Sequence, residues 1–210
     1  LLNKPGDIDA DNELIIDELP LDYSILEEID YIYPANNAYF AYMTRGCVNK
    51  CRFCAVPKLE PQYCDYINLK KRIEFTDKRF GARKDLLLLD NNVLASNCYE
   101  QIIDEIKEEG YLENVIFISF VWENCIALRS ILKENDIQFL TGNEVDDELI
   151  KKLKKENLNL DIHYKKLTKE AVKKLHKNGI KVNCWTCDDK AEAEKLVKMG
   201  VDFITSNILE

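Results

Sequence analysis

Hydrophobic and polar positions follow two rhythms along this chain, one typical of short buried strands and one typical of amphipathic helices. Asp85 to Asp90 (DLLLLD) has a wholly apolar centre, as strands inside a parallel sheet do. Residues 99–109 instead place apolar side chains at intervals of three and four residues, which predicts a helix. The two rhythms alternate over most of the chain.

The pattern predicts strands at 38–44, 85–90, 115–120, 138–141, 160–163, 181–186 and 202–205. It predicts helices at 68–80, 99–109, 123–133, 146–156, 168–178 and 190–199. Alternating strands and helices predict an α/β fold with a parallel sheet and helices outside, either doubly wound or curled into a barrel. Because these strands fall short of a closed eightfold barrel, we expect a partial or incomplete TIM-like β/α barrel.

Residues 1–35 are acidic and contain Pro20 and Pro34, so we predict an irregular arm with one short helix near Ser24 to Ile29. With only 7 Gly and 5 Pro in 210 residues, we expect disorder in the first dozen or so residues alone. The chain begins at Leu1, which leaves open that it is a piece of a longer protein.

Composition and charge narrow the class of function. The chain has 46% hydrophobic and 32% charged residues, as soluble globular proteins do. Its net charge of -9 argues against binding to nucleic acid or to anionic membranes, so we expect a small-molecule substrate and neither of those partners. No apolar stretch is long enough to span a bilayer and no signal peptide is visible, so we expect a cytoplasmic protein.

Three of the eight cysteines stand close together directly after the first predicted strand. Cys47, Cys51 and Cys54 have the spacing C-x3-C-x2-C. In a chain without a secretion signal, such cysteines favour metal ligation over disulfides. Three thiolates suit a [4Fe-4S] cluster that leaves one iron open to a cofactor or substrate.

The segment from Thr44 to Pro57, with Phe53 before the third cysteine, resembles the radical S-adenosylmethionine superfamily. The resemblance implies a [4Fe-4S] cluster that binds S-adenosyl-L-methionine, takes an electron from a donor and yields a 5'-deoxyadenosyl radical. It further implies that Phe53 lies near the adenine. By position alone, it assigns the amine of the cofactor to Asp90, Asn91 and Asn92.

A zinc site is the alternative at these cysteines, with Cys64 as a fourth thiolate ligand. The distance along the chain from Cys54 to Cys64 matches common zinc spacings poorly, so we favour the cluster. Cys98 and Cys125 are isolated and are expected in the core.

From Asn114 onward the sequence resembles a second family. The strand Val115 to Phe120, the segment Asp161 to Thr168, the run Gly179 to Asp189 and the ending Met199 to Asn207 resemble the second half of a glycerophosphodiester phosphodiesterase. That family folds as a β/α barrel and hydrolyses glycerophosphodiesters with a divalent cation and acid-base histidines.

The resemblance places those histidines, and most metal-binding carboxylates, in the family's first half, which begins with a His-Arg-Gly strand end. This chain lacks that triplet, and its only histidines are His163 and His176. We therefore expect a scaffold and a pocket wall, with Trp185 lining the substrate pocket and a divalent cation unlikely. Cys184 and Cys187 form a C-x-x-C pair open to a redox or zinc reading, but buried thiols in a strand are the better interpretation.

We thus divide the chain into a radical S-adenosylmethionine-like segment, residues 1–105, and a phosphodiesterase-like half-barrel, residues 106–210. The first hypothesis is a radical-type iron-sulfur protein of unknown substrate. The second is a glycerophosphodiester phosphodiesterase family protein of lipid metabolism that lacks its catalytic N-terminal half. The third is a non-catalytic fusion or truncated product, so enzymatic activity is left open.

Overall fold

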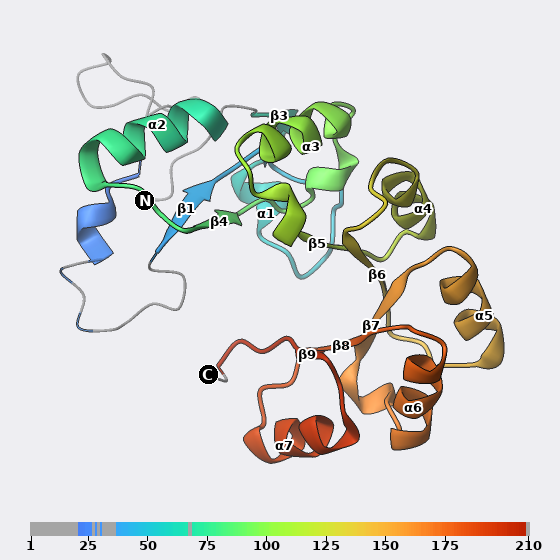
Figure 1. Ribbon diagram of the computed structural model, residues 1–210. Coiled ribbons are helices and arrows are strands. Elements are labelled where there is room, and N and C mark those ends of the chain that lie inside the picture. The colour runs from blue at the N-terminus through green and yellow to red at the C-terminus, as the bar shows by residue number, and fades with distance from the viewer. Residues whose placement is uncertain (1–20, 27, 29, 31–36, 67–68, 209–210) are drawn as a thin grey trace. The chain divides into compact units, whose positions relative to one another are not determined.

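A computed structural model describes residues 21–26, 28, 30, 37–66 and 69–208, and the following statements concern these residues (Figure 1). The chain divides into two compact units, Leu1–Leu112 and Glu113–Glu210. Most of the arm predicted at residues 1–35, including residues 1–20, lies outside the described residues.

The first unit combines a parallel strand pair with two longer helices. Its elements are the 3-10 helix η2 (Tyr23–Leu26), β1 (Ala38–Ala41), β2 (Thr44–Arg45), α1 (Val56–Leu59), β3 (Cys64–Asp65), α2 (Leu69–Phe80), β4 (Asp85–Leu88), η3 (Val93–Ala95) and α3 (Tyr99–Glu108). A last 3-10 helix, η4 (Leu112–Asn114), lies at the boundary of the two units.

Strands β1 and β4 pair in parallel, whereas β2 and β3 form a short antiparallel pair. Tyr39 of β1 is buried, and its hydroxyl bonds to Asp77 and accepts a hydrogen bond from the Arg83 backbone N–H at 3.0 Å. Burial, together with the Asp77 carboxylate, raises the pKa of Tyr39 to about 12. This hydroxyl therefore stays protonated and joins the strand to α2.

The second unit repeats one strand and one helix along its length. Its elements are β5 (Ile116–Ser119), α4 (Trp122–Ile131), β6 (Asp136–Thr141), α5 (Asp147–Lys155), β7 (Asn159–His163), η5 (Tyr164–Lys166), α6 (Lys169–Lys177), β8 (Val182–Trp185), α7 (Lys190–Met199) and β9 (Phe203–Ile204). Figure 1 shows the helices α4 to α7 following one another along the outer side of these strands.

The five strands of this unit pair in parallel and in the order β5-β6-β7-β8-β9. Consecutive order is typical of a barrel, whereas a doubly wound sheet reverses its order at one point. Two contacts pass over β7 and join β6 to β8. Asn183 Nδ2 donates to Gln138 Oε1 at 3.2 Å, and Lys181 Nζ lies 3.2 Å from Asp136 Oδ2. The sheet is therefore concave on this face, as part of a barrel wall is.

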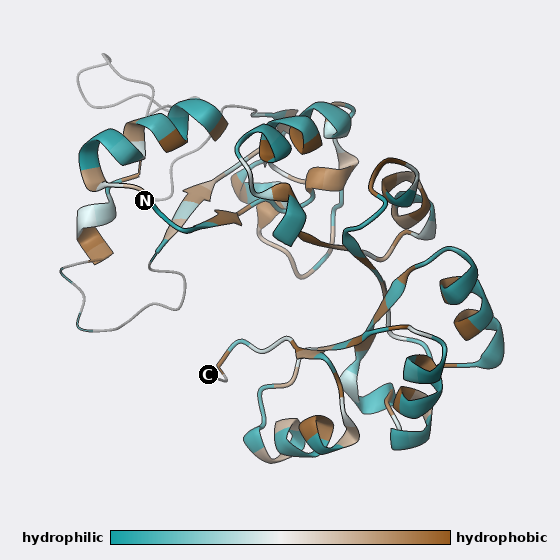
Figure 2. Cartoon of the chain, viewed as in Figure 1, coloured by the Kyte–Doolittle hydropathy of each residue, from teal (hydrophilic) through white to brown (hydrophobic). Residues whose placement is uncertain are grey.

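The opposite face of the sheet packs against the helices. Ile137, Leu160, Ile162 and Val182 are fully buried there, because alternate residues of a strand point to opposite faces. Figure 2 shows α5 and α6 with hydrophilic residues over much of their surface and hydrophobic residues between them, the pattern of helices with one buried face.

Side-chain caps fix where three of these helices begin. Asp146, Thr168 and Asp189 each accept a hydrogen bond from the backbone N–H three residues later, at 2.7, 3.1 and 2.9 Å. The caps hold α5, α6 and α7 close to the ends of the preceding strands. The loops that follow β6, β7 and β8 are thereby short and defined.

The predicted α/β fold with a partial parallel barrel is confirmed. Each predicted strand and helix between residues 38 and 205 has a counterpart, with bounds that differ by a few residues. The antiparallel pair β2·β3 and the short helix α1 were not predicted. In the part of the chain that the structure describes, no helix is long and apolar enough to cross a membrane.

Candidate functional site

Aromatic side chains gather where β7 and β8 end. His163 and Trp185 are register partners and the last residues of their strands. Their rings meet edge to face with centroids 5.1 Å apart, and Phe120 meets Trp185 in the same way at 5.9 Å. The carboxyl ends of parallel strands are where β/α barrels carry their active sites. We therefore take this edge as the candidate site.

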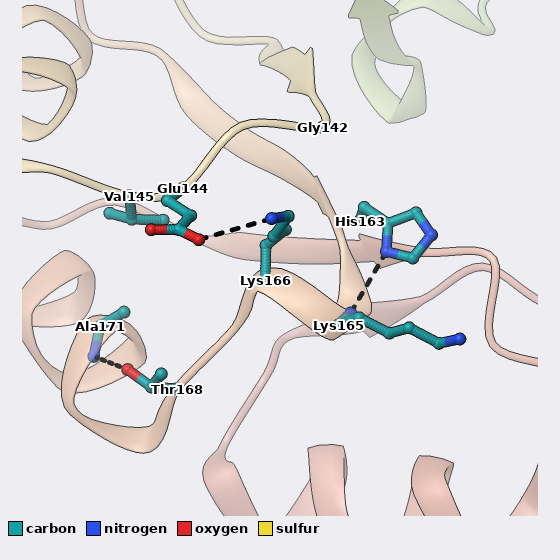
Figure 3. A pocket seen from close by; sticks show the side chains of 8 residues that line it. All are labelled: Gly142, Glu144, Val145, His163, Lys165, Lys166, Thr168 and Ala171. Carbon is teal, nitrogen blue, oxygen red and sulfur yellow. Dashed lines mark hydrogen bonds and ion pairs between the residues drawn. The ribbon is translucent and has the colours of Figure 1, made fainter.

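A pocket of about 650 Å³ lies beside His163, between the loop after β6 and the start of α6 (Figure 3). It is lined by Gly142, Glu144, Val145, His163, Lys165, Lys166, Thr168 and Ala171. Lys166 forms an ion pair with Glu144 at 3.4 Å, and both side chains are largely exposed. Such a pair contributes little to stability, so the ammonium group can exchange its carboxylate for another anion.

The His163 ring is oriented by its own backbone neighbourhood. Its Nδ1 accepts a hydrogen bond from the Lys165 N–H at 3.3 Å, and the ring stacks on Tyr164 with centroids 5.2 Å apart. A neutral imidazole that accepts at Nδ1 carries its proton on Nε2. His163 is therefore a hydrogen-bond donor at the edge of the sheet.

Two or three residues before the ends of these strands, the concave face is polar and closed to solvent. Asp161 and Gln138 are 1% and 0% exposed. Among the described residues, Asp161 Oδ1, Gln138 Nε2 and Asn183 Oδ1 are buried without a hydrogen-bond partner. Burial raises the pKa of Asp161 to about 7, because no cation compensates the loss of water around its carboxylate.

The predicted cofactor residues after β4 serve the backbone of the first unit. The Asp90 carboxylate accepts hydrogen bonds from Met43 N at 3.0 Å and from Thr44 Oγ1 at 2.6 Å. The Asn92 carbonyl accepts one from the Tyr63 hydroxyl at 3.0 Å. Asp90 therefore ties the end of β4 to the chain between β1 and β2, while Asn91 is exposed.

The predicted metal ligands lie on the loop between β2 and β3. Cys51 is exposed, Cys47 and Cys54 are half-buried, and the Phe53 side chain is 95% exposed. Within the residues that the structure covers, no group of three or more Cys, His, Asp or Glu side chains is arranged to hold a metal ion. Metal binding by these thiols stays a prediction.

The C-x-x-C pair lies in β8, which holds Cys184, and in the loop that follows it, which holds Cys187. Cys184 and Cys187 are both fully buried, and burial raises the pKa of Cys184 to about 12. A thiol so far from ionisation is neither a nucleophile nor a ready metal ligand. These two side chains are part of the core.

Comparisons with known proteins agree on one family. The sequence model of the glycerophosphoryl diester phosphodiesterase family matches residues 32–209. A glycerophosphodiester phosphodiesterase of Caldanaerobacter subterraneus subsp. tengcongensis is 32% identical over 118 residues, which are 55% of this chain and 47% of that protein. The chain thus spans about half the length of this curated relative.

Solved structures are similar in fold. A structure described as a glycerophosphodiester phosphodiesterase from Galdieria sulphuraria has a TM-score of 0.52 and 19% identity, covering 71% of this chain and 63% of its own. One from Parabacteroides distasonis has a TM-score of 0.49 and 24% identity, covering 66% and 59%. The first of these supports a β/α barrel fold for the chain.

These findings correct the assignment of the first hundred residues. The family match includes the cysteine segment and most of the predicted radical S-adenosylmethionine-like part, for which no comparison gives support. The predicted [4Fe-4S] cluster and S-adenosyl-L-methionine are therefore wrong. The predicted electron donor, and the cofactor roles given to Phe53, Asp90, Asn91 and Asn92, lose their basis with them.

The expectation about a divalent cation also needs correction, because the family consists of divalent-cation enzymes. The described residues do not fit such an ion, which prefers several oxygen ligands. At the sheet edge, Glu144 pairs with Lys166, and Asp188 accepts hydrogen bonds from Ser206 and Asn207. We therefore assign neither Glu144 nor Asp188 as a ligand of a divalent cation.

The family match covers well over half of the sequence and includes both units. Its range contains the strand ends that carry His163 and Trp185, and the α/β fold with parallel strands agrees with it. This chain belongs to the glycerophosphoryl diester phosphodiesterase family.

Proposed function

We propose that this chain binds glycerophosphodiesters, or the glycerol phosphate that their hydrolysis releases, at the carboxyl ends of β7 and β8. The observation that carries the proposal is the contact between His163 and Trp185 beside a pocket lined by Lys165 and Lys166. A phosphodiester has an anionic centre between two alcohol groups. At this edge of the sheet, cations and a hydrogen-bond donor can bind the anionic centre, and aromatic rings can contact the alcohol groups.

The phosphate would take the side of the lysines. Among the described residues, Lys166 pairs with an exposed carboxylate, and Lys165 lies over the Tyr164 ring with its Nζ 5.7 Å from the ring centroid. Charge-assisted hydrogen bonds from such ammonium groups to phosphate oxygens are stronger than neutral ones. The His163 Nε2 proton adds a donor at the same edge of the sheet.

The carbon-rich part of the ligand would lie against Trp185 and Phe120. Phe120 is 65% exposed, and an exposed aromatic ring at a strand end gains stability when a ligand covers it. Trp185 Nε1 is buried and has no hydrogen-bond partner among the described residues, so a hydroxyl or phosphate oxygen would satisfy it.

Hydrolysis is a separate step, for which the family uses acid-base histidines and a divalent cation. Of the two histidines in the sequence, His163 belongs to the edge, whereas His176 Nε2 lies 2.9 Å from Asp202 near the opposite ends of the strands. We therefore expect this chain to bind the diester without hydrolysing it.

Isothermal titration calorimetry with glycerol 3-phosphate and glycerophosphocholine tests the proposal on the full chain. We expect saturable binding that Trp185→Ala weakens by about tenfold or more, the usual consequence of losing a buried aromatic contact. Trp122→Phe is the matched control, because Trp122 packs on Phe139 on the helix side of the sheet. Absence of binding, or equal binding by both variants, would contradict the proposal. Choline release with Mg²⁺ or Ca²⁺ that EDTA abolishes would contradict the expectation of binding alone.

A further inference from the structure

We propose that the loop between β2 and β3 binds one thiophilic metal ion such as Zn²⁺ through Cys47, Cys51, Cys54 and Cys64. The proposal concerns a single ion held by thiolates and not an iron-sulfur cluster. It is independent of ligand binding at β7 and β8. The linear spacing of the cysteines matches common zinc sites poorly, so this proposal depends on the strand pairing and the turn that position the cysteines.

Strand pairing brings the two ends of the cysteine segment together. In the β2·β3 pair, Arg45 lies opposite Cys64, so Cys64 stands two residues across the ladder from Cys47. Cys47 and Cys64 therefore stand on the two sides of the base of the loop, where they can supply one pair of thiolates.

A turn forms the second pair. The Cys54 backbone N–H donates to the Cys51 carbonyl at 3.1 Å, which closes the C-x-x-C segment. Cysteines two residues apart in such a turn are a common half of a tetrahedral thiolate site. The loop thus carries one pair at its base and one along its course.

The base of the loop is firmly closed. Arg45 Nη2 and Nε donate to Glu60 Oε1 at 2.5 and 3.1 Å, and the Gly46 N–H donates to Glu60 Oε2 at 2.7 Å. Gly46 has a φ of +73°, and a Cβ there would lie 2.2 Å from the Gln62 carbonyl oxygen. The two sides of the base are therefore in direct backbone contact.

The loop above this base has no hydrophobic core. Residues 48–53 are all exposed, including Phe53 and Val48. Segments that cannot bury apolar surface are usually ordered by a disulfide or a metal ion. All four cysteines are free thiols in the described structure. A metal ion would order the loop in the place of a core.

Local charge suits a negatively charged metal site. The run from Gly46 to Leu59 contains Lys50, Arg52 and Lys58 and no acidic residue, although the whole chain has a net charge of -9. Four thiolates around Zn²⁺ have a net charge of about -2, which these side chains offset. Each thiol releases its proton on binding, and no electron transfer is needed.

The thiols are not prearranged as a complete ligand set among the described residues. Binding would therefore couple to a movement of the exposed part of the loop, as it does in small metal-binding domains. The closed base limits that movement to the residues between Gly46 and Glu60.

Titration of the reduced full-length chain with Co²⁺ tests the site, because tetrahedral cobalt thiolates have intense charge-transfer and visible bands. We expect one equivalent to bind and Zn²⁺ to displace it. Single Ser variants of Cys47, Cys51, Cys54 and Cys64 should each lose more affinity than the roughly 10–100-fold cost of losing an outer-shell partner. Cys98→Ser is the matched control, because Cys98 is a half-buried free thiol of the same unit.

Unfolding of each variant without metal checks that the fold is intact. Full affinity in Cys64→Ser would overturn the four-thiolate site. The absence of cobalt thiolate bands in the wild-type chain, or an equal loss of affinity in Cys98→Ser, would overturn metal binding by this loop.

Discussion

The imidazole of His163 meets the indole of Trp185 edge to face at the ends of two hydrogen-bonded parallel strands, with ring centroids 5.1 Å apart. Register fixes this contact, since the two residues are opposite each other in the β7·β8 pair. It places a polar ring and an apolar ring at one point of the sheet edge. The proposed binding of glycerophosphodiesters depends on this pair.

Asp161→Asn should change how stability depends on pH. The folded-state pKa of Asp161 is about 7 because of burial, whereas an unfolded chain has about 3.9. Between these values the folded state holds a proton that the unfolded state has lost, so the free energy of unfolding falls as pH rises. The asparagine variant removes this fall, which from about pH 5 to about pH 8 is on the order of 2–3 kcal/mol.

Urea unfolding at the two pH values measures the effect. Asp188→Asn is the control, because hydrogen bonds from Asn207 lower the pKa of that exposed carboxyl and it is ionised throughout this range. A difference between wild type and Asp161→Asn that stays constant with pH would show that Asp161 does not titrate as described.

Gly46→Ala should destabilise the first unit strongly. The residue has a φ of +73°, and its new Cβ would lie 2.2 Å from the Gln62 carbonyl oxygen. Gly81→Ala is the matched control, since its φ is +82° and nothing lies within 4 Å of a Cβ there. We expect about 1–2 kcal/mol for Gly81→Ala from backbone conformation alone, and at least about twice that for Gly46→Ala.

Chemical denaturation followed by circular dichroism compares the two glycine variants. Equal loss of stability would mean that the base of the β2·β3 loop yields without strain. In that case Gly46 would be required for its φ alone.

The cysteines should react with iodoacetamide in an order set by burial. Cys51 and Cys64 are exposed, whereas Cys125 and Cys184 are buried with pKa values raised to about 11 and about 12. With a chelator present, mass spectrometry should find the exposed thiols alkylated first and the buried ones only after unfolding. Early labelling of Cys184 would contradict its place in the core.

The alternation of strands and helices could be predicted from sequence, because the apolar positions of each element are those that pack in the core. Leu160, Ile162 and Val182 are apolar and face the helices, and Gly200 ends α7 with a φ of +94°. The strand order could not be read from the pattern, since doubly wound sheets and barrels share it. The crossing contact of Asn183 with Gln138 reveals the curvature only in three dimensions.

The candidate site was predictable in part. Trp185 stood out in the sequence, but its partner His163 ends the neighbouring strand β7 and its partner Phe120 follows β5, so only the fold brings them to it. The cysteine spacing led to the wrong cofactor, because three thiols after a strand are compatible with several metals or with none. The pairing of Arg45 with Cys64 is a tertiary feature that no linear spacing shows.

The most direct test of ligand binding at the sheet edge is a titration of the two indole N–H signals with glycerol 3-phosphate by NMR. The sequence has 2 tryptophans, so Trp122→Phe and Trp185→Phe assign both resonances. We predict that the Trp185 signal shifts in a saturable way while the Trp122 signal stays in place. Unchanged signals at saturating ligand, or a shift of Trp122 alone, would contradict the account.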